Sequence, residues 1–165
     1  MKYKLIAETK TVNSTVLMRI KALKSFNNVR EGDLGGWIES DRNLSQSGDA
    51  WVHCPAQVFG NAMVSGNAQV FGNAQVYGDA QVYGDAMVYG DAIVFGDAIV
   101  CGDAMVFGEA WVYGDAMVFG EARVYGEAIV FGDARVYGDA RVYGNAQVRD
   151  NALVSGDVQF FGETK

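Results

Sequence analysis

The chain has 165 residues and a formal net charge of −7 at pH 7, a length that suits one domain with a sizeable core. No apolar run reaches the roughly 18 residues that span a bilayer, and two cysteines suit a reducing compartment better than a disulfide-stapled fold. Residues 1–47 carry a net charge of +3 and residues 48–163 a net charge of −11. The acidic body should therefore repel nucleic acids and anionic membranes and attract basic protein surfaces.

The first 47 residues differ in pattern from the rest of the chain. Residues 3–7 and 15–22 are predicted to be the strands of a β-hairpin around the polar turn Asn13-Ser14. The N-terminus is charged and lacks the apolar segment of a signal peptide, so we expect a cytoplasmic protein. We divide the chain into a hairpin-containing capping module, residues 1–47, and a repeat region, residues 48–165.

From Gly48 onward the sequence repeats every six residues as G-[D/N/E]-A-x-V-x. Sixteen units keep the G-[D/N/E]-A-x-V core, and valine recurs from Val52 to Val154 without a miss. Ala and Val are two positions apart and share one face of a short strand, whereas the residues on either side of Val share the other. The nearly invariant Ala/Val face is predicted to be a narrow interior, and the variable, aromatic-rich face an exterior.

Gly and the acidic or amide residue after it are predicted to form the corner between strands. Gly adopts a positive φ without cost, and Asn or Asp tolerates the left-handed region better than Glu does. A strand and turn that never reverse direction must coil.

These repeats resemble the left-handed parallel β-helix of the hexapeptide-repeat family, which has three hexads in each 18-residue coil. The resemblance covers about residues 48–162 and implies an all-β rod of about six coils, roughly 30 Å long. The handedness comes from the resemblance alone, since the general crossover rule favours a right-handed coil.

A second resemblance concerns the segment from Phe26 to Gln46. Its pattern F-x-x-V-x-x-G-x-x-G-G-W…L-S-Q is similar to the N-terminal module of phage-borne and bacterial β-helix proteins of unknown function. We expect this module to cap the first coil, whose strand edges would otherwise pair with other chains. At the other end, Val158 and Phe160 replace Ala and Val, and these larger residues are expected to plug the core.

Eleven consecutive corners in the middle of the rod are acidic. They fall into three ladders with an 18-residue spacing: Asp79, Asp97, Asp115 and Asp133; Asp85, Asp103, Glu121 and Asp139; Asp91, Glu109 and Glu127. Solubility, a basic partner and divalent cations are the three interpretations of this charge. Asn occupies the same corner elsewhere, so the turn itself does not require a carboxylate.

The outward positions form rows of large side chains. One face combines six of them: Ile93, Phe95, Trp111, Tyr113, Ile129 and Phe131. An apolar area of this size is typical of contact sites. We expect this face to mediate self-association into a dimer or trimer.

Catalysis has little support in the sequence. Many hexapeptide-repeat proteins are acyltransferases that use a histidine base, and this chain has one histidine, His53, next to Cys54. Adjacent strand residues point to opposite sides, so the two should not act as a pair. Three zinc-binding histidines cannot be assembled from one, and we expect no metal, no cofactor and no catalytic residue.

Together these observations predict a non-enzymatic interaction protein of phage or prophage type in a bacterial cytoplasm. It would self-associate and bind a basic protein, such as a host nucleic-acid-binding protein, as a DNA mimic that inhibits host defence. It would not bind nucleic acid or membranes directly. The alternatives are a structural assembly module without a decoy role and a degenerate hexapeptide-repeat acyltransferase.

Overall fold

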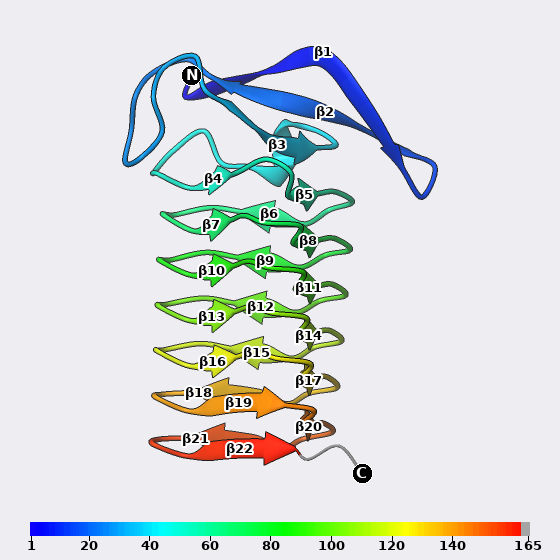
Figure 1. The fold of residues 1–165 in the computed structure, drawn as a ribbon, viewed down its shortest axis with the longest axis vertical. Helices are drawn as coiled ribbons and strands as arrows, with labels where there is room; N and C mark the ends of the chain where they lie inside the picture. The colour runs from blue at the N-terminus through cyan, green and yellow to red at the C-terminus, as the bar shows by residue number, and fades with distance from the viewer. Residues whose placement is uncertain (163–165) are drawn as a thin grey trace.

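A computed structural model describes residues 1–162 as a hairpin module on top of a three-sided parallel β-solenoid (Figure 1). The hairpin strands are β1 (Tyr3–Val12) and β2 (Thr15–Ala22), and a 3₁₀ turn, η1, spans Asp41–Asn43.

The solenoid strands form three faces, which we name A, B and C. Face A consists of β3 (Leu34–Ile38), β5 (Gln57–Val58), β8 (Gln75–Val76), β11 (Ile93–Val94), β14 (Trp111–Val112), β17 (Ile129–Val130) and β20 (Gln147–Val148). Face B consists of β4 (Trp51–Val52), β7 (Gln69–Val70), β10 (Met87–Val88), β13 (Met105–Val106), β16 (Arg123–Val124), β19 (Arg141–Gly144) and β22 (Gln159–Gly162). Face C consists of β6 (Met63–Val64), β9 (Gln81–Val82), β12 (Ile99–Val100), β15 (Met117–Val118), β18 (Arg135–Tyr137) and β21 (Leu153–Ser155).

Most repeats form a two-residue strand, because one hexad contains one Ala-x-Val strand and one Gly corner, and strands of three or four residues occur in the last coils. Strands 18 residues apart pair in parallel, as Ile93 does with Trp111. The backbone N–H of Ile93 donates to the carbonyl of Ala110 at 2.9 Å. The predicted all-β parallel solenoid is confirmed, and its architecture is consistent with the left-handed β-helix.

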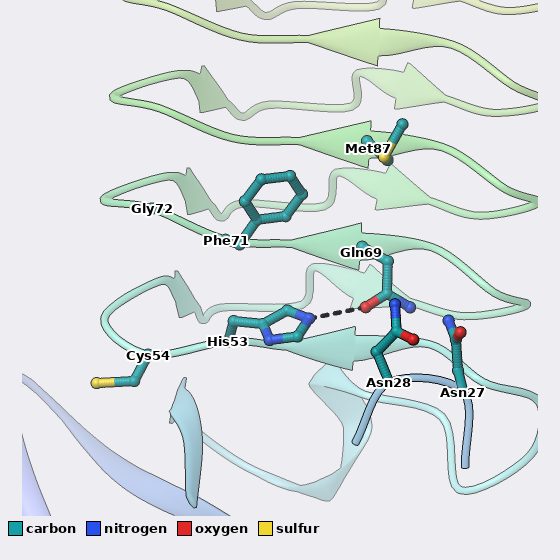
Figure 2. Close-up of a pocket in the computed structure, with 8 residues that line it drawn as sticks. All are labelled: Asn27, Asn28, His53, Cys54, Gln69, Phe71, Gly72 and Met87. Atoms are coloured by element: carbon teal, nitrogen blue, oxygen red, sulfur yellow. Dashed lines mark hydrogen bonds between the residues drawn. The ribbon is translucent and has the colours of Figure 1, made fainter.

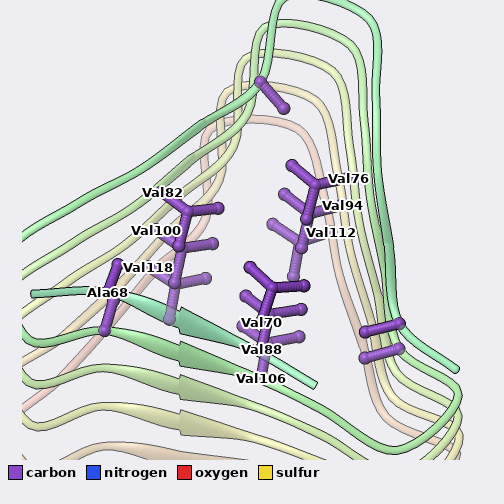
Figure 3. Close-up of a cluster of buried hydrophobic side chains, with 14 of the residues drawn as sticks. Ala68, Val70, Val76, Val82, Val88, Val94, Val100, Val106, Val112 and Val118 are labelled. Carbon is purple, nitrogen blue, oxygen red and sulfur yellow. The ribbon is translucent and has the colours of Figure 1, made fainter. Parts of the chain in front are cut away.

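The interior is built from stacked alanines and valines, as predicted. Ala92, Val94, Ala110 and Val112 are fully buried, whereas Tyr113 is partly exposed. The valine columns of the three faces point toward one another in a narrow core (Figure 3). A six-residue period thus produces an interior in which every coil has nearly the same contents.

The corners differ from the expectation in one respect. The glycines have a positive φ, as in Gly90 (φ 74°) and Gly108 (φ 72°), whereas the acidic residues after them do not. A Cβ on Gly90 would lie 2.9 Å from the backbone nitrogen of Gly108, so the stacking also requires glycine there. The expectation that the acidic residue is left-handed was wrong, and Glu is therefore not strained at a corner. Asp150 (φ 58°) has a positive φ because it occupies a glycine position.

The N-terminal module continues the stack as well as covering it. β2 pairs antiparallel with both β1 and β3, and β3 pairs in parallel with β5. Leu44 forms a bridge with Val64 at the top of face C. The solenoid consequently has about seven turns rather than six, because these rungs carry no G-x-A-x-V signature.

Two close-packed glycines and a set of polar contacts join the module to the rod. A Cβ on Gly36 would lie 2.4 Å from the carbonyl oxygen of Ala56, which explains the Gly-Gly-Trp motif. Trp51 is buried with its ring edge-to-face against Tyr3 (centroids 6.2 Å apart) and Phe26 (5.4 Å). The phenol of Tyr3 donates to the carbonyl of Leu44 at 2.6 Å, and burial raises its pKa.

Lys2 is the least expected member of the cap. It is 1% exposed, and its Nζ donates to the carbonyls of Ala50 (2.7 Å) and Gly48 (3.3 Å). Burial lowers the pKa of Lys2 to about 8, because desolvation disfavours the ammonium form. The lysine therefore binds carbonyl groups at the first coil that have no strand above them.

The opposite end is less closed than expected. Phe160 is in register with Val142 in the valine column, but Phe160 remains 41% exposed and Val158 48% exposed. The predicted plug was wrong in this sense: the larger side chains lie over the last coil without being enclosed. Among residues 1–162, no helix is long and apolar enough to cross a membrane.

Candidate interaction surfaces

Face A carries a continuous strip of large side chains. Ile93, Trp111 and Ile129 are in register on β11, β14 and β17, as their spacing predicted. Trp111 is 44% exposed, although its ring lies edge-on to Phe95 (centroids 6.3 Å apart). The structure thus brings the aliphatic and indole members of the predicted site into one row.

The remaining members of the strip form a stacked aromatic ladder beside that row. The rings of Phe95 and Tyr113 are 4.8 Å apart, and those of Tyr113 and Phe131 are 5.2 Å apart, all nearly parallel. Such stacking stabilises the strands that carry the rings. These aromatics are partly exposed, so they support the strip and also widen it.

A hollow of about 260 Å³ lies in this strip, lined by Glu109, Trp111, Glu127 and Ile129. Glu109 precedes β14, and Glu127 occupies the same corner one coil further along. The hollow therefore has two carboxylates at its edge and apolar side chains on its strand side. Sequence reasoning found all four residues but not the hollow they share.

All eleven acidic corners are exposed. Two ladders border face A: Asp91, Glu109 and Glu127 on the side where the chain enters it, and Asp97, Asp115 and Asp133 on the side where it leaves. The third ladder lies at the corner between faces C and B. The apolar strip consequently has a carboxylate rim along both edges.

Asparagine side chains stand at the top of each ladder. Asn61 donates to Asp79 at 2.9 Å, Asn67 to Asp85 at 3.0 Å, and Asn73 to Asp91 at 2.9 Å. The further carboxylates of the ladders are in none of the side-chain hydrogen bonds or ion pairs found in residues 1–162. No three metal-ligating side chains come together in the same part of the chain.

A second cavity, of about 530 Å³, lies where the module meets the rod (Figure 2). Asn27, Asn28, His53, Cys54, Gln69, Phe71, Gly72 and Met87 line it. No sequence pattern indicated this cavity, because Asn27 and Asn28 come from an irregular loop.

The hydrogen bonds of Gln69 define the state of His53. Gln69 Nε2 donates to the carbonyls of Asp49 and Asn67, both at 2.9 Å. Its Oε1 therefore faces His53 Nε2 at 2.9 Å, and that nitrogen must carry the hydrogen. The sulfur of Cys54 points away from the imidazole (Figure 2), so the two do not form a nucleophile–base pair.

Fold and surfaces together define a hexapeptide-repeat parallel β-solenoid with carboxylates at all three corners and an exposed tryptophan in the apolar strip of face A. The family described as YdcK Beta solenoid repeat matches residues 56–72, 80–96, 86–102 and 134–150. Among solved structures, a hexapeptide transferase family protein from Anaplasma phagocytophilum is similar, with a TM-score of 0.65 and 13% identity. That alignment covers 77% of this chain and 75% of the other. A search of curated proteins found no match.

These likenesses support the hexapeptide-repeat β-helix that the sequence resembles. At 13% identity, the likeness to the transferase concerns the fold alone. The phage-type resemblance of the N-terminal module stays a prediction.

Proposed function

We propose that the chain is a non-catalytic interaction protein that binds a basic protein partner through face A. The observation that carries the proposal is the exposed Trp111 in an apolar strip with a carboxylate rim along both edges. Apolar contact supplies affinity in such an arrangement, and the rims select a cationic partner and speed its approach.

The linear charge density of the rod supports a partner that normally binds nucleic acid. Three acidic corners occur in each coil, and a coil rises by about 4.8 Å, so carboxylates recur about every 1.6 Å along the axis. Duplex DNA carries one negative charge per about 1.7 Å. Arg123, Arg135, Arg141 and Arg149 reduce the net negative charge of the later coils. The coils from Asp79 to Glu109 therefore have the charge spacing most similar to that of duplex DNA.

In its specific form, this proposal makes the chain a phage or prophage decoy for a host defence protein in a bacterial cytoplasm. This decoy role is supported by the resemblance of the N-terminal motif to phage-borne proteins and by the spacing of carboxylates along the rod. It requires no site for a cofactor.

The test uses a variant that removes one rim. Asp97→Asn, Asp115→Asn and Asp133→Asn together keep the corner geometry, since Asn already occupies equivalent corners. Immobilised wild type and triple variant are exposed to nuclease-treated bacterial lysate, and bound proteins are eluted with salt from about 0.05 to 0.5 M. The proposal expects a basic protein retained by the wild type and lost or eluted earlier from the variant. Equal retention by both would contradict it.

Self-association through the same strip remains a prediction with its own salt dependence. Two copies that meet face A to face A bring carboxylate rims together, so added salt should strengthen their contact by screening. Binding of a basic partner should weaken when salt is added, because the attraction between opposite charges is screened. The sign of the salt effect therefore distinguishes the two kinds of contact.

Acyl transfer is the second candidate, favoured by the cavity at His53. The neutral form of His53 would leave Nδ1 as its acceptor, because Nε2 is committed to Gln69. Equilibrium dialysis against acetyl-coenzyme A, for wild type and His53→Ala, separates the candidates. Saturable donor binding with acyl transfer lost in His53→Ala would favour the enzyme.

A further inference from the structure

We propose that the hollow formed by Glu109, Trp111, Glu127 and Ile129 receives an arginine side chain of the protein partner. This inference rests on the proposed function and specifies its chemistry at one place. Four features of the hollow lead to it: an exposed indole, two unpaired carboxylates, the choice of Glu at this corner, and the distribution of the rod's own cations.

The first feature is the indole itself. Trp111 is 44% exposed on a hollowed part of the surface. Tryptophan is the best aromatic platform for a cation, and arginine the cation most often found on one. A planar guanidinium can stack on the ring and still direct its N–H groups sideways.

The second feature is the pair of carboxylates. Glu109 and Glu127 are one coil apart, about 4.8 Å along the axis, and neither has an ion pair in residues 1–162. At that spacing two like charges repel, and a cation between them removes the repulsion. The forked guanidinium can donate to both, which a lysine ammonium matches less well.

The third feature is the length of these side chains. Glutamate occupies three of the eleven acidic corners, and two of the three border Trp111. Aspartate serves at Asp91, the next rung of the same ladder, so the corner does not require the longer residue. The extra methylene lets a carboxylate reach over the strip toward the hollow.

The fourth feature is that three of the rod's four arginines lie on other faces, and the fourth, Arg149, follows β20 at the far end of face A, beside Asp150. Arg123 and Arg141 are on face B and Arg135 is on face C. Arg135 borders a hollow with Asp133, and Arg141 borders one with Asp139. A second copy that docked through its own face A would bring the carboxylates of its rims to this hollow. Face-A-to-face-A self-association would therefore leave the hollow without a cation, and we assign the cation to the protein partner.

The experiment uses three acetylated peptides of equal length, rich in arginine, lysine or glutamine. Binding is measured by tryptophan fluorescence, with Trp111→Phe to assign the signal, and by calorimetry. Glu109→Gln/Glu127→Gln is compared with the matched control Asp85→Asn/Asp103→Asn, which removes the same charge at the corner between faces C and B. Circular dichroism verifies that each variant keeps the wild-type fold.

We expect the arginine peptide to bind more tightly than the lysine peptide, and the glutamine peptide not to bind. Glu109→Gln/Glu127→Gln should weaken arginine binding by about tenfold, and the control by less than about threefold. An equal loss of affinity in both variants, or equal affinity for the arginine and lysine peptides, would contradict an arginine site in this hollow. Either result would still be compatible with a basic partner. Failure of the wild type to bind either basic peptide would overturn the receptor and count against the proposed function itself.

Discussion

The N-terminal module and the rod use their residues in opposite ways. In the module, large and polar side chains make contacts that occur once: Lys2 with two carbonyls, Tyr3 with a third, and Tyr3 and Phe26 with the ring of Trp51 in the first coil. In the rod, the same Ala and Val contacts recur in every coil. The module therefore concentrates stability in a few residues, whereas the rod distributes it and leaves its exterior free to vary. Function is expected on that exterior.

The largest expected effect separates two tryptophans. Trp51→Ala should lower the free energy of unfolding by about 3–5 kcal/mol, because it leaves a cavity under the module. Trp111→Ala should change the free energy of unfolding by less than about 1 kcal/mol, since that ring is half exposed. Urea unfolding followed by circular dichroism checks both. Equal losses would mean that the outer face is as structural as the cap.

A smaller effect is expected inside the rod. Ala110→Leu should destabilise the protein by about 1–3 kcal/mol by overpacking a core with no spare volume. Met117→Leu, an outward change in the same coil, is the control and should be nearly neutral. A silent Ala110→Leu in thermal unfolding would refute the narrow core.

The cap should also make stability depend on pH. The pKa of Lys2 is about 8 in the folded chain against its ordinary value of 10.5, so the unfolded chain binds more protons between these pH values. Stability should rise with pH across this window, by up to about 3 kcal/mol at about 1.36 kcal/mol per pKa unit. The rise should be absent in Lys2→Met when urea midpoints are compared at pH 7.5 to 10.5. The same dependence of the urea midpoint on pH in both proteins would show that burial does not lower the pKa of Lys2.

The smallest effect concerns the rims. The triple variant Asp97→Asn, Asp115→Asn and Asp133→Asn should gain about 0.5 kcal/mol at low salt by losing like-charge repulsion. Asn61 already donates to Asp79 at 2.9 Å, so amides fit this ladder. Thermal unfolding at low and high salt checks the gain. A loss of stability would mean that the carboxylates hold the corner.

The repeat region was predictable from the sequence because its information is local and redundant. Val94 and Val112 had to share an interior column, and Ile93 and Trp111 an exterior one, once the period of six was recognised. The corner of Glu109 was misjudged because sequence alone did not reveal that Gly108 supplies the positive φ by itself.

The module was less predictable because its contacts join distant residues without a period. Nothing in the sequence around Lys2 indicates that it bonds to Ala50, or that Asn27 and Asn28 border a cavity with His53 and Gln69. Leu44 joins the solenoid although its segment lacks the repeat. Contacts of this kind can be identified only when the three-dimensional structure is known, because no repeat in the sequence indicates which distant residues meet.

Sedimentation velocity of wild type and Trp111→Glu tests the role of face A most directly. Each protein is run alone at about 0.5 M salt, where screening favours self-association, and at low salt with the basic protein captured from lysate. The account predicts that the wild type forms species heavier than the 17.8 kDa chain in both cases. Trp111→Glu should sediment as a monomer in both, with an unchanged β signal in circular dichroism. A wild type that stays monomeric alone, together with a Trp111→Glu variant that binds the partner as tightly as the wild type, would contradict it.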